Sequence, residues 1–215
     1  MSDMNPRRLL AGSALGIVAL LSLTACATPS SSSGSPDAPA GHSLGSLWPA
    51  PPESEVVGQG TVMDVGGAPE LCLGPIMESY PPQCHGIPLA GWSWDGVDGA
   101  ESVGDVRWGT YAVQGTYDGE TLTVTRPPIM LALYDPMMTE DPTGGKAGAG
   151  EEAELQEIQD ALPDLLGAEY LSSFPENGWL WVDVVWDDGT WQKAADDDYG
   201  TGVVVIGSAL RAVSG

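Results

Sequence analysis

The chain has 215 residues, and its 30 Asp or Glu against 7 Lys or Arg give a formal net charge of −23. This acidity argues against nucleic-acid binding and against a basic surface that docks on anionic lipid, because both need clustered Lys and Arg. The hydrophobic content of 42%, with eight Trp, is too high for a fully disordered chain. We therefore expect one folded domain or two small ones.

Residues 1–25 have the order of a secretory signal: Arg7 and Arg8, then the apolar run Leu9–Leu23, then small residues. The apolar run is shorter than the ~20 residues that a membrane-spanning helix needs. We therefore interpret residues 1–25 as a signal peptide. The two arginines leave open whether export follows the general secretory or the twin-arginine route.

The sequence Leu23-Thr24-Ala25-Cys26 resembles the lipobox of bacterial lipoproteins. This resemblance implies cleavage after Ala25, acylation of Cys26 with chains such as palmitate, and anchoring on the extracytoplasmic face of the cell membrane. Two acyl chains give a lasting anchor, whereas one chain binds reversibly. The alternative is an ordinary cleaved signal that leaves Cys26 unmodified.

Residues 26–55 are rich in Ser, Pro, Gly and Ala, which predicts a flexible linker that holds a folded part away from the membrane. Within this linker, residues 41–45 read Gly-His-Ser-Leu-Gly and match the G-x-S-x-G motif of α/β-hydrolases. That motif requires a strand before it and a helix after it. Since linker sequence lies on both sides, we interpret the match as a coincidence.

Residues 56–134 read as short strands separated by Gly and Pro, which favours a small antiparallel barrel or a sandwich, with an OB-like barrel preferred. The Asp118-Gly119 pair predicts a hairpin with a two-residue turn. Gly66-Gly67 and Pro127-Pro128 are two further breaks. The expected strands are Val57–Val65, Tyr111–Tyr117, Glu120–Thr125 and Ile129–Tyr134.

Cys72 and Cys84 lie in this β-rich module. If Cys26 is acylated, Cys72 and Cys84 are the two free thiols that remain in an oxidising compartment. Two remaining thiols predict one disulfide between them. The bridge would close a loop of ~13 residues and stabilise the fold by about 3 kcal/mol in the chain-entropy model. A metal or redox site that uses His85 beside Cys84 is the alternative, although the chain lacks the C-x-x-C spacing.

Trp92, Trp94 and Trp108, with Asp95 beside them, form the candidate ligand face. Two indoles spaced by two residues lie on one face of a strand, where exposed rings stack on sugars. Asp95 would then accept hydrogen bonds from hydroxyl groups. The alternative is that the three indoles fill the core of a module that contains no Phe.

Residues 135–150 are rich in Gly, Pro and Ala and predict a second flexible join. Residues 151–215 then predict an α-β-α-β module. Its first helix begins at Glu151, and Pro163 is expected to end or kink it at about Ala161 or Leu162. Its apolar residues recur every three or four positions and form one stripe. The stripe consists of Leu155, Ile158, Leu162 and Leu165.

The second half of this module contains the strand Leu180–Trp186, a helix over Thr190–Tyr199 and the strand Val203–Ile206. Gly200 follows the helix at a position that favours positive φ. The two strands are expected to be parallel, joined by the helix. The alternative is a hairpin at Asp188-Gly189. The predicted fold class is therefore α+β, a small OB-like antiparallel barrel followed by a short α-β-α-β module.

Chemical motifs give few leads. The acidic pair at 187–188 and the run of three aspartates at 196–198 lack the spacing of a calcium loop. No dinucleotide, phosphate or zinc motif is present. We predict no catalytic residues, no metal and no cofactor. Glu70–Trp94 and Tyr199–Val213 are similar to stretches of uncharacterised surface lipoproteins of high-GC Gram-positive bacteria, a resemblance that implies no activity.

We therefore predict a membrane-anchored, extracytoplasmic lipoprotein that acts as a non-enzymatic binding or interaction module. Its expected partners, apart from the membrane at Cys26, are a cell-wall glycan or another envelope protein. One alternative is a glycan-directed hydrolase that uses carboxylates near Trp92 and Trp94. The other is a cation-binding lipoprotein.

Overall fold

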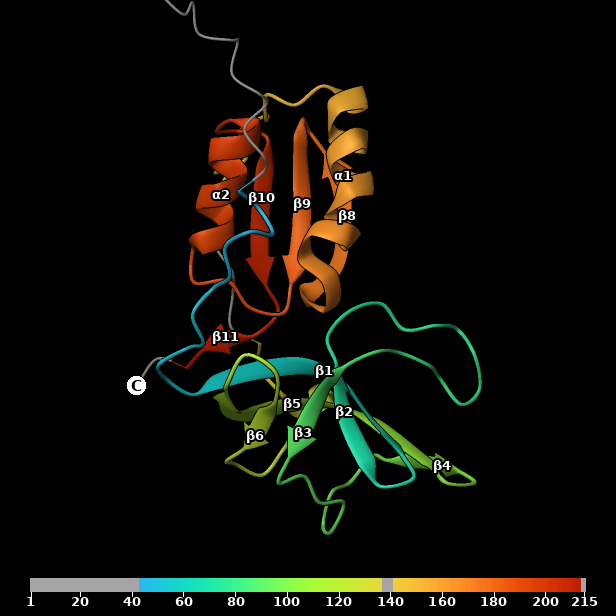
Figure 1. The fold of residues 1–215 in the computed structure, drawn as a ribbon. Helices are drawn as coiled ribbons and strands as arrows, with labels where there is room; N and C mark the ends of the chain where they lie inside the picture. The colour runs from blue at the N-terminus through green and yellow to red at the C-terminus, as the bar shows by residue number, and fades with distance from the viewer. Residues whose placement is uncertain (1–42, 137–140, 214–215) are drawn as a thin grey trace, which may run out of the picture. The chain divides into compact units, whose positions relative to one another are not determined.

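The computed structural model describes residues 43–136 and 141–213 (Figure 1). The predicted signal peptide, Cys26 and the linker up to residue 42 lie outside the described residues. The described chain forms a β-barrel and a second, three-stranded sheet with two α-helices. The predicted fold class, a small barrel followed by an α/β module, is therefore confirmed.

Five strands close the barrel in the order β1-β2-β3-β6-β5, and β5 pairs back onto β1 along its length. β3 and β6 are parallel, whereas the other barrel pairs are antiparallel. The bounds of these strands are β1 Val56–Val65, β2 Ala68–Cys72, β3 Ile87–Ala90, β5 Val106–Tyr117 and β6 Leu122–Val124. Three short strands extend the barrel sheet, namely β4 Glu101–Val103, β7 Ile129–Met130 and β11 Arg211–Ala212.

Apolar residues of these strands fill the barrel, as the alternation in the sequence predicts. The fully buried members include Val62, Leu71 and Val113. The hairpin predicted at Asp118 is present, but its turn runs from Asp118 to Thr121. The Asp118 carboxylate accepts hydrogen bonds from the backbone N–H groups of residues 120 and 121, so the side chain, and not a two-residue turn, sets the loop.

The strand predicted over Ile129–Tyr134 is wrong in its second half. Only Ile129 and Met130 pair with β5, and a 3₁₀ turn, η1 (Leu131–Leu133), follows them. Leu133 is exposed, so burial does not favour continuing the strand there.

The second sheet has the order β10-β9-β8, with β8 Tyr170–Glu176, β9 Trp179–Val184 and β10 Val204–Ser208. β9 and β10 are parallel and are joined by a helix, as predicted. β8 is an additional strand that the sequence analysis missed. It forms an antiparallel hairpin with β9 through Asn177 and Gly178, which both have positive φ.

Two helices, α1 (Glu152–Leu166) and α2 (Thr190–Tyr199), pack on one face of this sheet (Figure 1). The helix end expected at about Ala161 or Leu162 is wrong, because α1 continues through Pro163 to Leu166. Leu166 is fully buried and completes the apolar stripe in place of Leu165, which is only partly buried. Gly200 follows α2 with a φ of 90°, as predicted.

The barrel and the α/β layer share packing. Val185 and Leu210, which follow β9 and β10, are buried in the cluster that fills the barrel. The last strand, β11, pairs with β1. The C-terminal segment is therefore part of the barrel sheet.

Both predicted linkers are partly wrong where the structure describes them. In the first, Leu44 has 1% exposure and lies in the core between the helices and the sheet. In the second, the backbone N–H groups of residues 148–150 donate to carbonyls of Asn177, Gly178 and Gly202. Both segments are rich in small residues, a composition that is typical of flexible linkers. Small residues can also pack closely against other backbones, as they do here.

Candidate functional site

The described residues line a cleft of about 1040 Å³. Its walls come from five segments that are far apart in the sequence. They are residues 48–51, the connection from β2 to β3, the β5–β6 turn, the α1–β8 junction and the β9–α2 junction. Both the barrel and the α/β layer therefore contribute to it. Its lining is mainly apolar and aromatic.

Three indoles shape one side of the cleft. Trp191, at the start of α2, is fully buried and donates from Nε1 to the carbonyl of Leu47 at 2.8 Å. Trp48 packs edge-on against it, with ring centroids 5.6 Å apart, and remains 59% exposed. Trp186 donates from Nε1 to the carbonyl of Ala50 at 2.9 Å. These two indole hydrogen bonds hold residues 47–50 in place, so that Trp48 faces the cleft.

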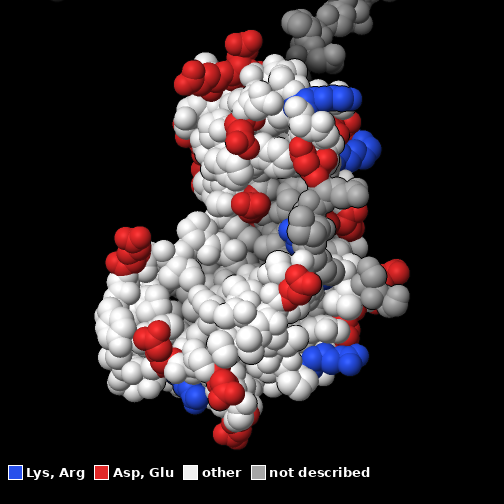
Figure 2. Space-filling view, turned by 180° about the vertical axis from the view of Figure 1, so that it is seen from behind, with Lys and Arg blue, Asp and Glu red and all other residues white. Residues whose placement is uncertain are grey.

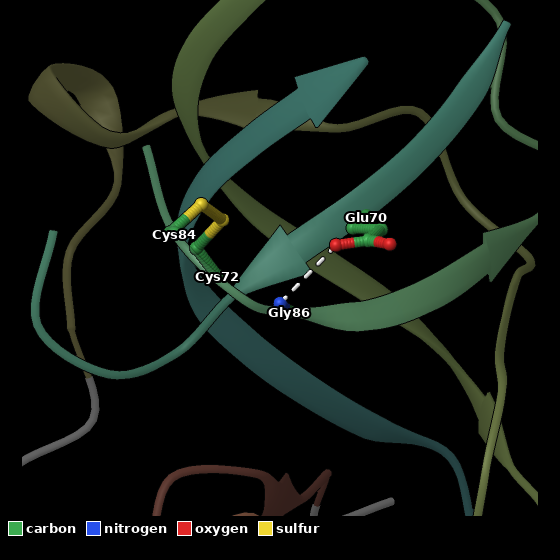
Figure 3. Close-up of a disulfide and its surroundings, with 4 residues drawn as sticks. All are labelled: Glu70, Cys72, Cys84 and Gly86. Carbon is green, nitrogen blue, oxygen red and sulfur yellow. Dashed lines mark hydrogen bonds between the residues drawn. A yellow bond between two sulfur atoms is a disulfide. The ribbon is translucent and has the colours of Figure 1, made fainter. Parts of the chain in front are cut away.

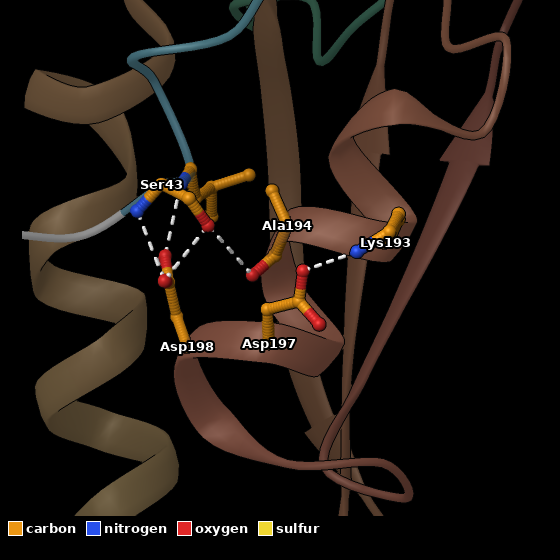
Figure 4. A network of polar contacts seen from close by, with 6 residues as sticks. Ser43, Lys193, Ala194, Asp197 and Asp198 are labelled. Atoms are coloured by element: carbon orange, nitrogen blue, oxygen red, sulfur yellow. Dashed lines mark hydrogen bonds and ion pairs between the residues drawn. The ribbon is translucent and has the colours of Figure 1, made fainter.

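Residues 43–47, which we name the N-terminal strap, are fixed at the helical face of the α/β layer (Figure 4). The Asp198 carboxylate accepts hydrogen bonds from the backbone N–H groups of Ser43 and Leu44, at 2.9 and 2.8 Å, and from Ser43 Oγ at 2.9 Å. Gly45 has a φ of 80° and lies so close to the carbonyl of Leu165 on α1 that a Cβ would collide with it. The strap therefore contacts both helices.

The strap also explains the hydrolase-like motif. Ser43 Oγ donates to Asp198 and to the carbonyl of Ala194, so the hydroxyl is used in a structural network (Figure 4). Ser43 is the first described residue, and a turn, not a helix, follows it. This geometry is consistent with the interpretation that the motif is a coincidence.

Glu169 is the half-buried acid of the cleft. It ends η2 (Gly167–Glu169), the turn between α1 and β8, and its Oε1 accepts a hydrogen bond from the hydroxyl of Tyr117 at 3.3 Å. Burial raises the pKa of the Glu169 carboxyl above its ordinary value, and the Tyr117 hydrogen bond only partly offsets this effect. Burial, followed by the charge of Glu169, raises the pKa of the Tyr117 hydroxyl as well.

The predicted disulfide between Cys72 and Cys84 is confirmed (Figure 3). It ties the end of β2 to the segment that leads into β3. Beside it, the backbone N–H of Gly86 donates to Glu70 Oε2 at 3.3 Å. Gly86 packs so closely on the backbone of Leu71 that a Cβ would not fit. These contacts fix the position of the adjoining cleft residues, which include Leu73, Gly74, Pro75 and His85.

The predicted ligand face lies elsewhere, on the barrel. Trp92 and Trp94 are half-buried, pack against Tyr111 and each other, and belong to the barrel cluster. Trp94 Nε1 donates to Asp64 Oδ2 at 2.8 Å, and the Arg107 guanidinium lies 4.6 Å from its ring.

The other two members of that face are separated by burial. Trp108 has 7% exposure and packs beside the disulfide, with Tyr80 edge-on against its ring at 5.5 Å. Asp95 is exposed. A ligand role for this face stays a prediction, and the packing of the indoles agrees with the alternative of core residues. None of the four residues lines the cleft.

The acidic runs near α2 have structural roles. Asp187 caps α2, because its carboxylate accepts hydrogen bonds from the backbone N–H groups of Trp191 and Gln192. Asp197 pairs with Lys193, and Asp198 holds the strap. Within residues 43–136 and 141–213, no three His, Cys, Asp or Glu side chains are grouped to hold a metal ion.

The sequence matches no known protein-family profile, and neither a curated protein nor a solved structure matches it. In the part of the chain that the structure describes, no helix has both the length and the apolar character needed to cross a membrane. Acidic side chains are scattered over the face shown in Figure 2, where basic side chains are few.

Sequence analysis missed the cleft residues because they share no local pattern. Trp48 lies in a segment that reads as linker, and Glu169 lies in a turn after an unpredicted helix end. Only one local signal was available and overlooked: Asn177-Gly178 is a strong hairpin pair. It would have predicted β8 and therefore the turn that carries Glu169.

Proposed function

We propose that this chain is a lipid-anchored, extracytoplasmic binding protein that holds a small molecule in the cleft. The cleft carries this proposal. Its volume of about 1040 Å³ is at the upper end of the range of small-molecule sites, which is roughly 300–1,000 Å³. Such sites are lined mostly by apolar and aromatic side chains with a few polar groups, as this cleft is.

The lining favours a ligand with a substantial apolar body. Leu71, Ile87 and Val185 are buried side chains that form part of the walls, and Trp48 and Trp186 add aromatic surface. Polar side chains on the walls are few, with His85, Glu120 and Glu169 as the titratable ones apart from tyrosines. A glycan would need more hydrogen-bonding groups than these walls carry. The cleft therefore supports a mainly apolar ligand, whereas the candidate ligand face on the barrel suggests a sugar.

The anchoring part of the proposal is supported by the lipobox alone. Cys26 lies outside the described residues, and the strap begins at Ser43. The 16 residues between Cys26 and Ser43 would span roughly 20–25 Å as the flexible linker that the sequence predicts. That length would hold the cleft close to the membrane surface, within reach of molecules that partition there.

The binding proposal can be tested with N-phenyl-1-naphthylamine, an uncharged probe whose fluorescence increases in apolar sites. The full mature chain with Cys26→Ser is used so that no detergent competes. We expect saturable binding that Trp48→Ala weakens and that Leu133→Ala, an exposed position outside the cleft, leaves unchanged. Absence of saturable binding, or equal effects of both substitutions, would contradict a ligand site in the cleft.

A further inference from the structure

Glu169 has no Lys or Arg beside it among the described residues that line the cleft. The five basic residues after the predicted signal peptide all lie in the described part of the chain, and none of them lines the cleft. The hydrogen bond from the Tyr117 hydroxyl is the polar contact that Glu169 Oε1 makes there. A carboxylate that is partly removed from water without a counter-charge is energetically unfavourable. Burial raises the pKa of the Glu169 carboxyl for the same reason.

Aromatic rings line the same cleft as this acid. Trp48, Trp186, Tyr117 and Tyr170 line the same cleft, and Trp48 has more than half of its surface free. The faces of indole and phenol rings attract cations, and desolvated sites strengthen this attraction. The walls of one cleft therefore carry a carboxylate and several aromatic rings, and both features favour a positively charged group.

The remaining charges have the same sign. Glu120, on the β5–β6 turn, is the other acid of the cleft, and it is exposed. The mature chain has 29 acidic and 5 basic residues, so the field around it attracts cations and repels anions. His85 is the one imidazole among the described lining residues.

We propose that the ligand of the cleft is an organic monocation with an apolar body, an amine or a quaternary ammonium compound, whose charge is neutralised by Glu169 and contacts the ring of Trp48. This inference rests on the proposed function, because it names the ligand class of the same cleft. The apolar walls hold the body of the ligand, and the acid selects its charge.

Three probes with the same alkyl chain separate charge from apolar burial: hexyltrimethylammonium, 1-hexanol and hexyl sulfate. Each is titrated into the full mature chain with Cys26→Ser, and the backbone N–H resonances of Gly119 and Gly167, two cleft residues, are followed by NMR. We expect the cation to bind about tenfold more tightly than the alcohol, as one charged contact predicts, and the sulfate to bind most weakly.

Two matched substitutions locate the effect. Glu169→Gln should abolish the preference for the cation and leave 1-hexanol binding unchanged, whereas Glu120→Gln, at the exposed acid, should preserve most of the preference. Equal affinities for all three probes, tighter binding of the sulfate, or equal effects of both substitutions would overturn the monocation inference while the binding function stands. No shifts with any probe would overturn the proposed function as well.

Discussion

Leu44→Ala should destabilise the folded chain strongly, although Leu44 lies in a segment whose composition resembles a linker. The side chain has 1% exposure and belongs to the core cluster of α1, α2 and the second sheet. Truncating a buried Leu to Ala costs about 2–5 kcal/mol, because apolar contacts are lost and a cavity remains. We expect about 3 kcal/mol for this site.

The neighbouring Leu47 supplies the matched control. It is in the same strap but is 53% exposed, so Leu47→Ala should change the free energy of unfolding by less than about 0.5 kcal/mol. The measurement is urea unfolding of the full mature chain. With an m value of about 2 kcal/mol/M, a loss of 3 kcal/mol lowers the midpoint by about 1.5 M.

The refuting result is equally specific. If Leu44→Ala and Leu47→Ala have the same midpoint as the parent chain, the strap does not contribute to the core. Trp48 would then lose its fixed position, because the same segment carries it into the cleft.

Three further predictions concern the strap contact of Asp198, the pKa of Glu169 and the disulfide. Asp198→Asn should destabilise the fold by about 1–3 kcal/mol, because it weakens charge-assisted hydrogen bonds to the strap. Asp197→Asn is the control and should cost less than about 0.5 kcal/mol, because it removes only an exposed ion pair. Equal losses of stability in urea unfolding would contradict the role of Asp198. Burial raises the pKa of Glu169, so the stability that this group contributes is fully present below its unfolded pKa of about 4.5 and is lost as pH rises through the folded pKa. The parent chain should therefore lose stability relative to Glu169→Gln as pH rises from about 4.5 through the folded pKa of Glu169, and a relative gain of the parent chain in that direction would contradict the raised pKa. Replacing Cys72 and Cys84 together by Ala should cost about 2–4 kcal/mol in thermal or urea unfolding, and an unchanged midpoint would show that the bridge does not constrain the unfolded chain.

The sequence was informative where local patterns decide the structure. β1 ends at Gly66-Gly67 because both residues have positive φ there. The parallel pair β9 and β10 follows from two apolar runs separated by a helix. The disulfide follows from a count of the thiols left after the predicted acylation of Cys26, in a compartment that we predict to be oxidising.

Where distant segments meet, the sequence was not informative. α1 extends through Pro163 because Leu166 gains a buried position against the sheet, which no local propensity reveals. The strap reads as linker since its single buried side chain, Leu44, lies among small residues. The cleft depends on five segments at once, so its residues become neighbours only in the folded chain.

The most direct measurement for the whole account is native mass spectrometry of the protein released from membranes of producing cells. We expect a chain that begins at Cys26 and carries an acyl modification, with a small molecule bound to the parent chain and reduced in Trp48→Ala. A chain with unmodified Cys26, and without a bound molecule in either form, would contradict a membrane-anchored protein whose cleft holds a ligand.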